Sequence, residues 1–388
     1  MATEKIQGNQ DIDSIDELVD LIKSWYESDF NGFATAYNKA VQNVQPIPPG
    51  TDESVIYNWK DASINDLCQF FRDWFAWNPD LSTGLQYIQK FSWLYYKSED
   101  GLAFVQSASG YFITKSFVDI NGKKMDSPDS KELVKKWEEE IGEGMNDYII
   151  PQGGYENFNQ FFARELKPGL RPVSSPDDNS IVASPADAIV NMIDDNLTLE
   201  SKLDCKTQKL TINELLDNSK FAESFIGGTA ISCILMPTVY HRYHAPVSGS
   251  IVESREDVAG QYFGIDDFPK LLNGGNVGYG YDYSVFEHFR RGYLVIETKD
   301  YGNVAMIPVG LNTIASVIFD DKYKNIDASS PVPVTKGDEI GYFQYGGSLN
   351  ILLFEKGCFP SLRIPQGQMI GHLNKKEAEP KEEVTFIF

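Results

Sequence analysis

Beyond residue 150, the apolar residues of this chain occur in short runs that Gly, Pro and Asp interrupt at close intervals. Short apolar and β-branched runs bounded by turn residues are typical of strands in antiparallel sheets. The runs are "SIVASPADAIVNMI", "TAISCILMP", "GSIVESRE", "GYLVIET", "NVAMIPVG" and "TIASVIF". This pattern predicts a mostly antiparallel sheet or a barrel-like sandwich over residues 150–388.

The first 149 residues instead carry the periodicity of amphipathic helices. Segments 14–26 and 63–77 each begin with a serine, followed three residues later by an acid, and then place apolar residues on one helical face. Residues 130–141 are a third candidate, and residues 156–166 are expected to add one more helix. The predicted fold class is therefore α+β, with a helical region at 1–149 followed by a β domain at 150–388.

The stretch "YFQYGGSLNILLFEKG" places a Gly-Gly-Ser triplet, residues 346–348, directly before the run "NILLFE". Because the apolar residues of this run are continuous rather than alternating, it is expected to be a central strand. The related segments 332–343 and 362–373 flank the triplet, and their glycines predict a hairpin in each. The triplet thus lies at the start of a buried strand.

A serine that follows two glycines can attack the backbone before it. The Ser348 hydroxyl reaches the Gly347 carbonyl through a five-membered ring, and glycine tolerates the strained backbone that this attack requires. Asp187, a histidine and Ser348 could also serve as orienter, base and nucleophile of a hydrolase. However, no G-x-S-x-G elbow surrounds Ser348. The residues therefore favour self-cleavage and leave the hydrolase open.

Two of the four histidines stand in "VYHRYHAPVSG", as His241 and His244. An HxxH pair on a helix can bind metal, but Pro237 and Pro246 make this segment extended or turning, and no Cys or third His lies near it. We therefore expect no metal site. Two partly buried structural histidines remain the alternative that the spacing leaves open.

Four segments, in this order, resemble the phosphatidylserine decarboxylase family. They are "NFNQFFARELKPGLRPV", "SPADA", "YHRYHAPVSG" and "YFQYGGSLNILLFEKG", and they fall within residues 150–388. The resemblance implies that this part is the catalytic domain of a pyruvoyl enzyme, whose precursor cleaves itself between Gly347 and Ser348. Residue 348 would become the pyruvoyl cofactor, and the large and small chains of the precursor would stay associated.

The resemblance also implies roles for single residues. His244, oriented by Asp187, would deprotonate Ser348 for its attack on the Gly347 carbonyl. After maturation, the pyruvoyl ketone would form a Schiff base with the substrate amine and take up the electrons that departing CO2 leaves behind. His241 would then reprotonate the substrate carbon.

Four further positions bear on the same resemblance. Leu349 stands where the family usually has Ser or Thr, and Ala188 stands where it commonly has Gly; neither change removes a reacting group. Arg164 and Lys167 belong to the first motif. They are expected either to support the structure or to attract the carboxylate of a substrate.

The charge of the chain limits its partners. The formal net charge is −22, a field that repels nucleic acid and disfavours stable association with an anionic membrane. The four cysteines are far apart and form no CxxC pair, the first residues lack a secretory signal pattern, and no apolar stretch is long enough to span a bilayer. We expect a cytoplasmic protein.

The aromatic-rich helical region resembles the soluble branch of the family, whose members decarboxylate free amino acids, and the net charge opposes an anionic lipid bilayer. The expected substrate is therefore a free L-amino acid, such as an aromatic one, which the enzyme converts to the amine. The alternative is a phosphatidylserine decarboxylase that makes phosphatidylethanolamine. A second alternative is an uncleaved, non-catalytic binding protein.

Overall fold

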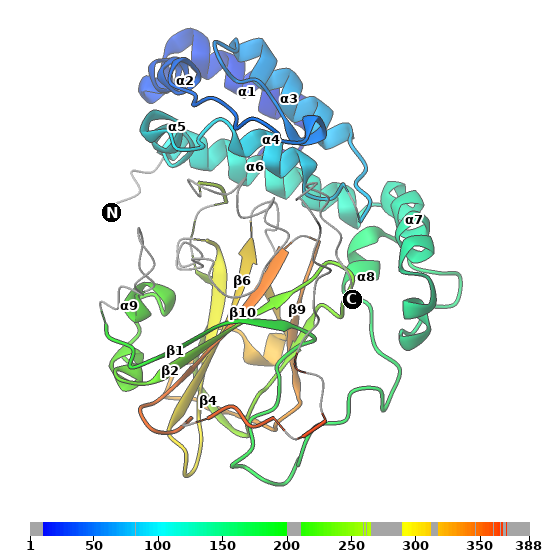
Figure 1. Ribbon diagram of the computed structural model, residues 1–388, viewed down its shortest axis with the longest axis vertical. Helices are drawn as coiled ribbons and strands as arrows, with labels where there is room; N and C mark the ends of the chain where they lie inside the picture. The colour runs from blue at the N-terminus through cyan, green and yellow to red at the C-terminus, as the bar shows by residue number, and fades with distance from the viewer. Residues whose placement is uncertain are drawn as a thin grey trace.

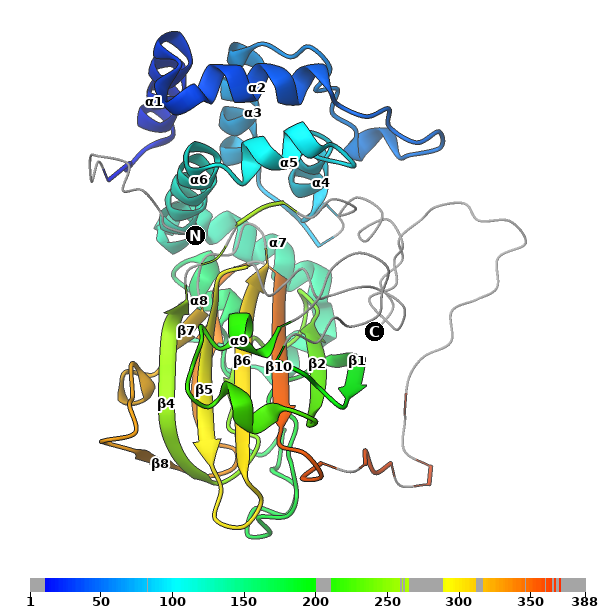
Figure 2. The ribbon, with the colours of Figure 1, turned by 90° about the vertical axis from the view of Figure 1, so that its left-hand side faces the viewer.

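The computed structural model describes residues 11–81, 83–199, 211–258, 260, 262–264, 289–311, 317–345, 347–359, 361–364, 366, 367 and 370. Helices at one end and antiparallel strands at the other confirm the predicted α+β class (Figure 1). The helices that precede residue 127 form a layer across one end of the strands (Figure 2). No helix among the described residues is long and apolar enough to cross a membrane.

The helices of the first half follow from local signals. Ser63 and Asp66 form a reciprocal capping box at the start of α3, as predicted. Ser14 caps α1, but the Glu17 carboxylate accepts from the backbone N–H of Asp13 and not from that of Ser14. The α-helices are α1 (Ile15–Ser28), α2 (Phe33–Gln42), α3 (Ile64–Ala76), α4 (Gln86–Ser92), α5 (Glu99–Val105), α6 (Ala108–Asp126), α7 (Lys131–Ile141), α8 (Phe158–Phe162) and α9 (Ile212–Leu215). Short 3-10 turns are η1 (Phe30–Gly32), η2 (Glu53–Val55), η3 (Pro128–Ser130), η4 (Gly142–Asp147), η5 (Ala222–Phe225) and η7 (Asp321–Tyr323).

The helix expected over 156–166 is shorter than predicted. It ends at Phe162, and the chain after it becomes extended and pairs with an earlier segment: Leu166 bridges to Tyr148 and the Ile149 N–H donates to Glu165 O at 2.8 Å. This long-range pairing overrides the local helical pattern.

The described strands form two antiparallel sheets. The larger has the order β1-β2-β10-β6-β5-β4-β8, and the smaller has the order β3-β9-β7. β10 lies in the interior of the larger sheet, between β2 and β6, as its continuous apolar run predicted. The strands are β1 (Ile189–Asp195), β2 (Thr229–Leu235), β3 (Arg242–His244), β4 (Gly249–Val258), β5 (Arg291–Glu297), β6 (Asn303–Leu311), β7 (Val317–Phe319), β8 (Val332–Val334), β9 (Glu339–Phe343) and β10 (Gly347–Phe354).

The hairpin predicted over 332–343 is wrong. β8 pairs with β4 in the larger sheet, whereas β9 pairs with β3 and β7 in the smaller one. The segment is therefore a corner between sheets. The prediction failed because strand partners are chosen by contacts distant in sequence. Part of the second copy, 362–373, lies outside the described residues.

The two faces of β10 belong to different cores. Leu349, Ile351 and Leu353 are buried in the cluster that includes the helical layer. Leu352 and Phe354 pack with Tyr243 and Phe343 of the smaller sheet. Because side chains alternate along a strand, the even-numbered residues of β10 all face the smaller sheet.

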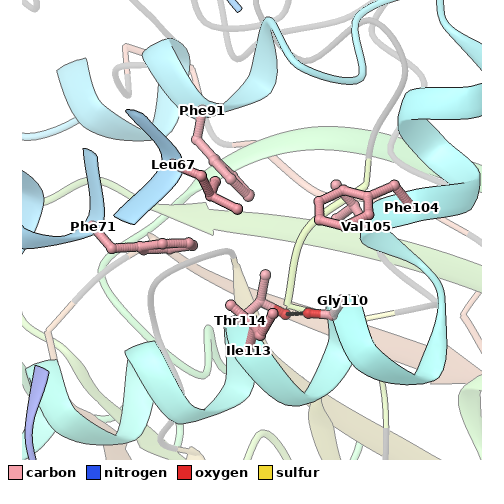
Figure 3. Close-up of a pocket in the computed structure, with 8 residues that line it drawn as sticks. All are labelled: Leu67, Phe71, Phe91, Phe104, Val105, Gly110, Ile113 and Thr114. Atoms are coloured by element: carbon pink, nitrogen blue, oxygen red, sulfur yellow. Dashed lines mark hydrogen bonds between the residues drawn. The ribbon is translucent and has the colours of Figure 1, made fainter. Parts of the chain in front are cut away.

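The helical layer also encloses a small apolar cavity (Figure 3). Its polar lining atom, the Thr114 hydroxyl, already donates to Gly110 O at 2.9 Å. The cavity therefore offers a ligand no free polar group from these side chains. Its lining residues are Leu67, Phe71, Phe91, Phe104, Val105, Gly110, Ile113 and Thr114.

Candidate active site

Ser348 is the second residue of β10 and is fully buried. It lies opposite Leu235 of β2 and Gly310 of β6, on the face that packs against the smaller sheet. Its Oγ has no hydrogen-bond partner among the described residues. A buried hydroxyl without a partner is costly, so its retention at this position needs a functional explanation.

The connection from β9 to β10 is held by aromatic packing. The Tyr345 ring meets the edges of Trp137, Phe158 and Phe162, with centroids 5.1–6.1 Å apart. The Tyr345 N–H also donates to Asn159 Oδ1 at 3.2 Å. Side chains of α7 and α8 thus fix the chain immediately before the Gly347–Ser348 bond.

His241 lies beside this connection. Its backbone oxygen accepts from the N–H of Phe343, the last residue of β9, at 2.9 Å. Its ring stacks on Phe162 at a centroid distance of 3.9 Å, and Phe162 in turn contacts Tyr345. The structure therefore brings His241 and the start of β10 into one region, through a shared aromatic neighbour.

The state of the His241 ring follows from its contacts. Nδ1 lies 2.9 Å from Val239 O, and because a carbonyl only accepts, Nδ1 carries the proton. Nε2 is then the basic nitrogen; it is buried and has no partner among the described residues. Burial, helped by the positive charge of Arg164, lowers the pKa of His241 to about 3. The ring is a neutral base at physiological pH.

Arg164 is buried as well, and no carboxylate pairs with it among the described residues. Its NH2 group donates to Thr238 O at 2.5 Å and to Val239 O at 3.2 Å, and the guanidinium lies 4.1 Å from the Tyr148 ring centroid. Of the two roles expected for Arg164, these contacts favour structural support, since the cation holds the backbone that leads into His241.

His244 has a partner on each ring nitrogen. Nδ1 lies 2.9 Å from Gly337 O, so it donates, and Nε2 lies 2.9 Å from the Tyr240 hydroxyl, so it accepts. Burial raises the pKa of Tyr240, which keeps the phenol protonated. His244 is thus also held with Nε2 as its basic nitrogen, but a proton from Ser348 could reach it only after Tyr240 moves or relays it.

Asp187 is expected to orient His244, but its carboxylate pairs with Arg171 instead. Arg171 binds its carboxylate on both oxygens, with Nε 3.0 Å from Oδ1 and NH2 2.8 Å from Oδ2. The link between the two segments is through the backbone: the His244 N–H donates to Pro185 O at 2.8 Å. The motif with Asp187 therefore lies beside β3, but its acid neutralises a neighbouring arginine in this arrangement.

Sequence reasoning missed four residues of this region: Tyr240, Arg171, Phe162 and Asn350. All four stand inside the quoted motifs, but for the first three nothing in the local pattern says which side chain they contact. Asn350 did carry a signal, because it is an amide within an otherwise continuous apolar strand. Its side chain is fully buried, and neither Oδ1 nor Nδ2 has a partner among the described residues.

Comparison with known proteins agrees with these motifs. The phosphatidylserine decarboxylase family profile matches residues 158–373. A phosphatidylserine decarboxylase proenzyme of Clostridium perfringens is 32% identical over 311 residues, which cover 76% of this chain and 96% of the relative. That of Fusobacterium nucleatum is 32% identical over 242 residues (62% and 74%). Proenzyme 3 of Schizosaccharomyces pombe is 32% identical over 243 residues, covering 63% of this chain and 23% of the relative.

Proposed function

This chain belongs to the phosphatidylserine decarboxylase family, and we propose that it is a self-cleaving proenzyme whose mature form converts phosphatidylserine to phosphatidylethanolamine. The reaction class, a pyruvoyl-dependent carboxy-lyase, is that of the family. The observation that carries the proposal for this chain is the buried, unpartnered Ser348 hydroxyl at the second residue of an interior strand.

Of the two candidate substrates, the free amino acid expected from the sequence has less support than phosphatidylserine. The relatives that match most of their own length are named for phosphatidylserine, which favours the alternative. The net charge of the whole chain does not exclude a lipid substrate. Salt screens a charge within about 8 Å at physiological ionic strength, so a distant acidic surface does not prevent a local face from meeting a lipid headgroup.

Ser348 fits the origin of the pyruvoyl group. The family's pyruvoyl group derives from a serine of the chain itself, and Ser348 already stands at the start of a strand with its oxygen free of competing hydrogen bonds. When present, the group supplies an electron-withdrawing carbonyl that accepts the electron pair left by CO2. Ser348 is fully buried, so this position is shielded from bulk water.

We assign the maturation step to residues of the chain. Ser348 Oγ attacks the carbonyl carbon of Gly347, its proton passes to a histidine Nε2, and the Gly347–Ser348 peptide bond becomes an ester with a free amine on residue 348. Elimination then releases the Gly347 carboxylate and leaves a dehydroalanine, whose imine tautomer takes up water and loses ammonia to give the ketone.

The two histidines are proposed to divide the work as the resemblance implies. His244, with its basic Nε2 held toward Tyr240, serves the self-cleavage, and Asp187 supports it from the adjacent segment. His241 returns a proton to the substrate carbon after CO2 leaves; because its Nε2 carries no proton in the free protein, it first takes that proton from the ammonium group of the bound substrate. A base must be within hydrogen-bond reach of the proton it removes. Because the Tyr240 hydroxyl is bonded to Nε2 of His244, either this hydrogen bond breaks during self-cleavage or Tyr240 relays the proton from Ser348 to His244.

Cleavage at this bond leaves the small chain, 348–388, in place. From Ser348 to Phe354, each residue of β10 pairs with a residue of β2 and with one of β6. The new chain end is therefore held on both sides by strands of the large chain. This supports the proposal that the large and small chains of the precursor stay associated after the cut at 347/348.

The substrate is tested by CO2 release. Purified protein is given carboxyl-labelled phosphatidylserine in mixed micelles, or each of a panel of free L-amino acids, with Ser348→Ala as the matched control. We expect release from the lipid alone, and none from the control. Release from a free amino acid alone would restore the earlier expectation, and an intact chain with no release would favour the binding protein.

A further inference from the structure

Asn350 is the polar residue of the central strand that the proposed function does not yet use. It lies two residues after Ser348, is fully buried, and leaves both polar atoms of its carboxamide without a partner among the described residues. An unpaired amide destabilises a core, and an apolar side chain of similar size would fit such a strand better. A buried, unpaired carboxamide at this position is explained if it makes a hydrogen bond during a step of the reaction.

The neighbours of Asn350 across the sheet cannot be that partner. On β2 it faces Cys233, whose buried thiol has its pKa raised to about 12 and is a weak hydrogen-bonding group. On β6 it faces Pro308, which has no N–H. The three strands lie side by side in Figure 2.

The neighbours on the same face along the strand narrow the choice further. In one direction the next side chain is that of Leu352, which is apolar and packs in the core toward the smaller sheet. In that sheet, the Tyr243 hydroxyl already donates to Ile318 O at 2.7 Å. In the other direction the next side chain is that of Ser348, whose oxygen is likewise without a partner.

We propose, building on the proposed function, that the Asn350 carboxamide is the hydrogen-bond partner of the oxygen on residue 348. Residues two apart on a strand are about 6.6 Å apart, and side chains lean along the strand direction. The bond is not made in this structure, where neither side chain has a partner among the described residues, but at this spacing a change of rotamer brings the two side chains within hydrogen-bond length. Asn350 Nδ2 donates to Ser348 Oγ as negative charge develops there, while the histidine takes the proton.

This role makes Asn350 a catalytic residue of self-cleavage, because it touches the reacting oxygen. The same role predicts that one substitution both slows cleavage and stabilises the precursor. Asn350→Leu removes the donor, so cleavage slows, but it also removes an unpaired buried amide, so the precursor becomes more stable. A residue with a merely structural role would give the opposite sign of stability.

The test follows cleavage of the full chain in cell-free translation, by pulse-labelling and denaturing gels. Asn350→Leu is expected to slow the appearance of the large and small chains by about 10- to 100-fold, the loss expected when one hydrogen bond to an oxygen that becomes charged is removed. The matched control is Ser232→Ala. Ser232 is also a buried, unpartnered polar residue in the sheet, but it pairs with Ile351 and so faces away from Ser348; this variant is expected to cleave at the wild-type rate.

Stability is measured on uncleavable precursors. The Tm of Ser348→Ala/Asn350→Leu is expected to exceed that of Ser348→Ala by about 2 °C or more. Cleavage of Asn350→Leu at the wild-type rate overturns the proposal, as does slow cleavage accompanied by a lower Tm. A wild-type chain that stays intact contradicts the proposed function itself, whereas a cleaving wild type beside an equally fast Asn350→Leu overturns only the role of Asn350.

Discussion

Replacing His241 should make the precursor less sensitive to acid. A histidine in an unfolded chain titrates near pH 6.5, whereas burial lowers the pKa of folded His241 to about 3. Between these values the unfolded state binds more protons, so stability falls as the pH drops below 6.5 and continues to fall toward pH 3. From pH 7.5 to pH 5.5, this single residue accounts for a loss of about 1.4 kcal/mol in the free energy of unfolding.

The assay is urea unfolding of Ser348→Ala and Ser348→Ala/His241→Gln at these two pH values. The lower pH of the assay stays above the sequence pI of about 4.6, the pH at which the net charge vanishes and the protein tends to precipitate. Groups other than His241 titrate alike in both proteins, so the difference between their pH effects isolates the 1.4 kcal/mol, a figure worked from the same linkage. Equal pH dependence in the two proteins would refute the neutral, buried state of His241.

Two further changes probe the acid and the cavity. Asp187→Asn breaks the pair with Arg171; because the two side chains are 26% and 47% exposed, stability should fall by no more than about 1 kcal/mol, while self-cleavage on denaturing gels should stop. Cleavage at the wild-type rate would contradict the role given to Asp187. Val105→Ile adds one methyl group toward the apolar cavity in Figure 3, and should raise the free energy of unfolding by about 0.8 kcal/mol. A lower Tm would mean that the cavity cannot accept it.

The local signals of the sequence predicted the parts of the fold that local physics decides. The capping box of Ser63 and Asp66 predicted the start of α3, and the continuous apolar run after Ser348 predicted an interior strand. Both features depend on residues within a few positions of one another. The hairpin predicted over 332–343 failed because β8 finds its partner in β4, more than seventy residues earlier in the chain.

In the site, too, local motifs could be predicted from the sequence, whereas contacts between distant segments could not. The motifs identified Ser348 and both histidines, and the structure places Ser348 and His241 in one region. The contacts that set their chemistry are not local: Arg171 reaches Asp187, Gly337 fixes the tautomer of His244, and Phe162 packs on His241. Nothing in the sequence near a histidine states which carbonyl or ring will face it, because tertiary packing decides that.

The central claim is that the Gly347–Ser348 bond breaks from within and leaves a ketone on residue 348. Mass spectrometry of the denatured wild-type protein tests it most directly. We expect two chains, with the smaller beginning at residue 348 and lighter by one ammonia than the same peptide with an N-terminal serine, and a single chain for Ser348→Ala. A wild-type protein that remains one full-length chain and still releases CO2 from its substrate would contradict it.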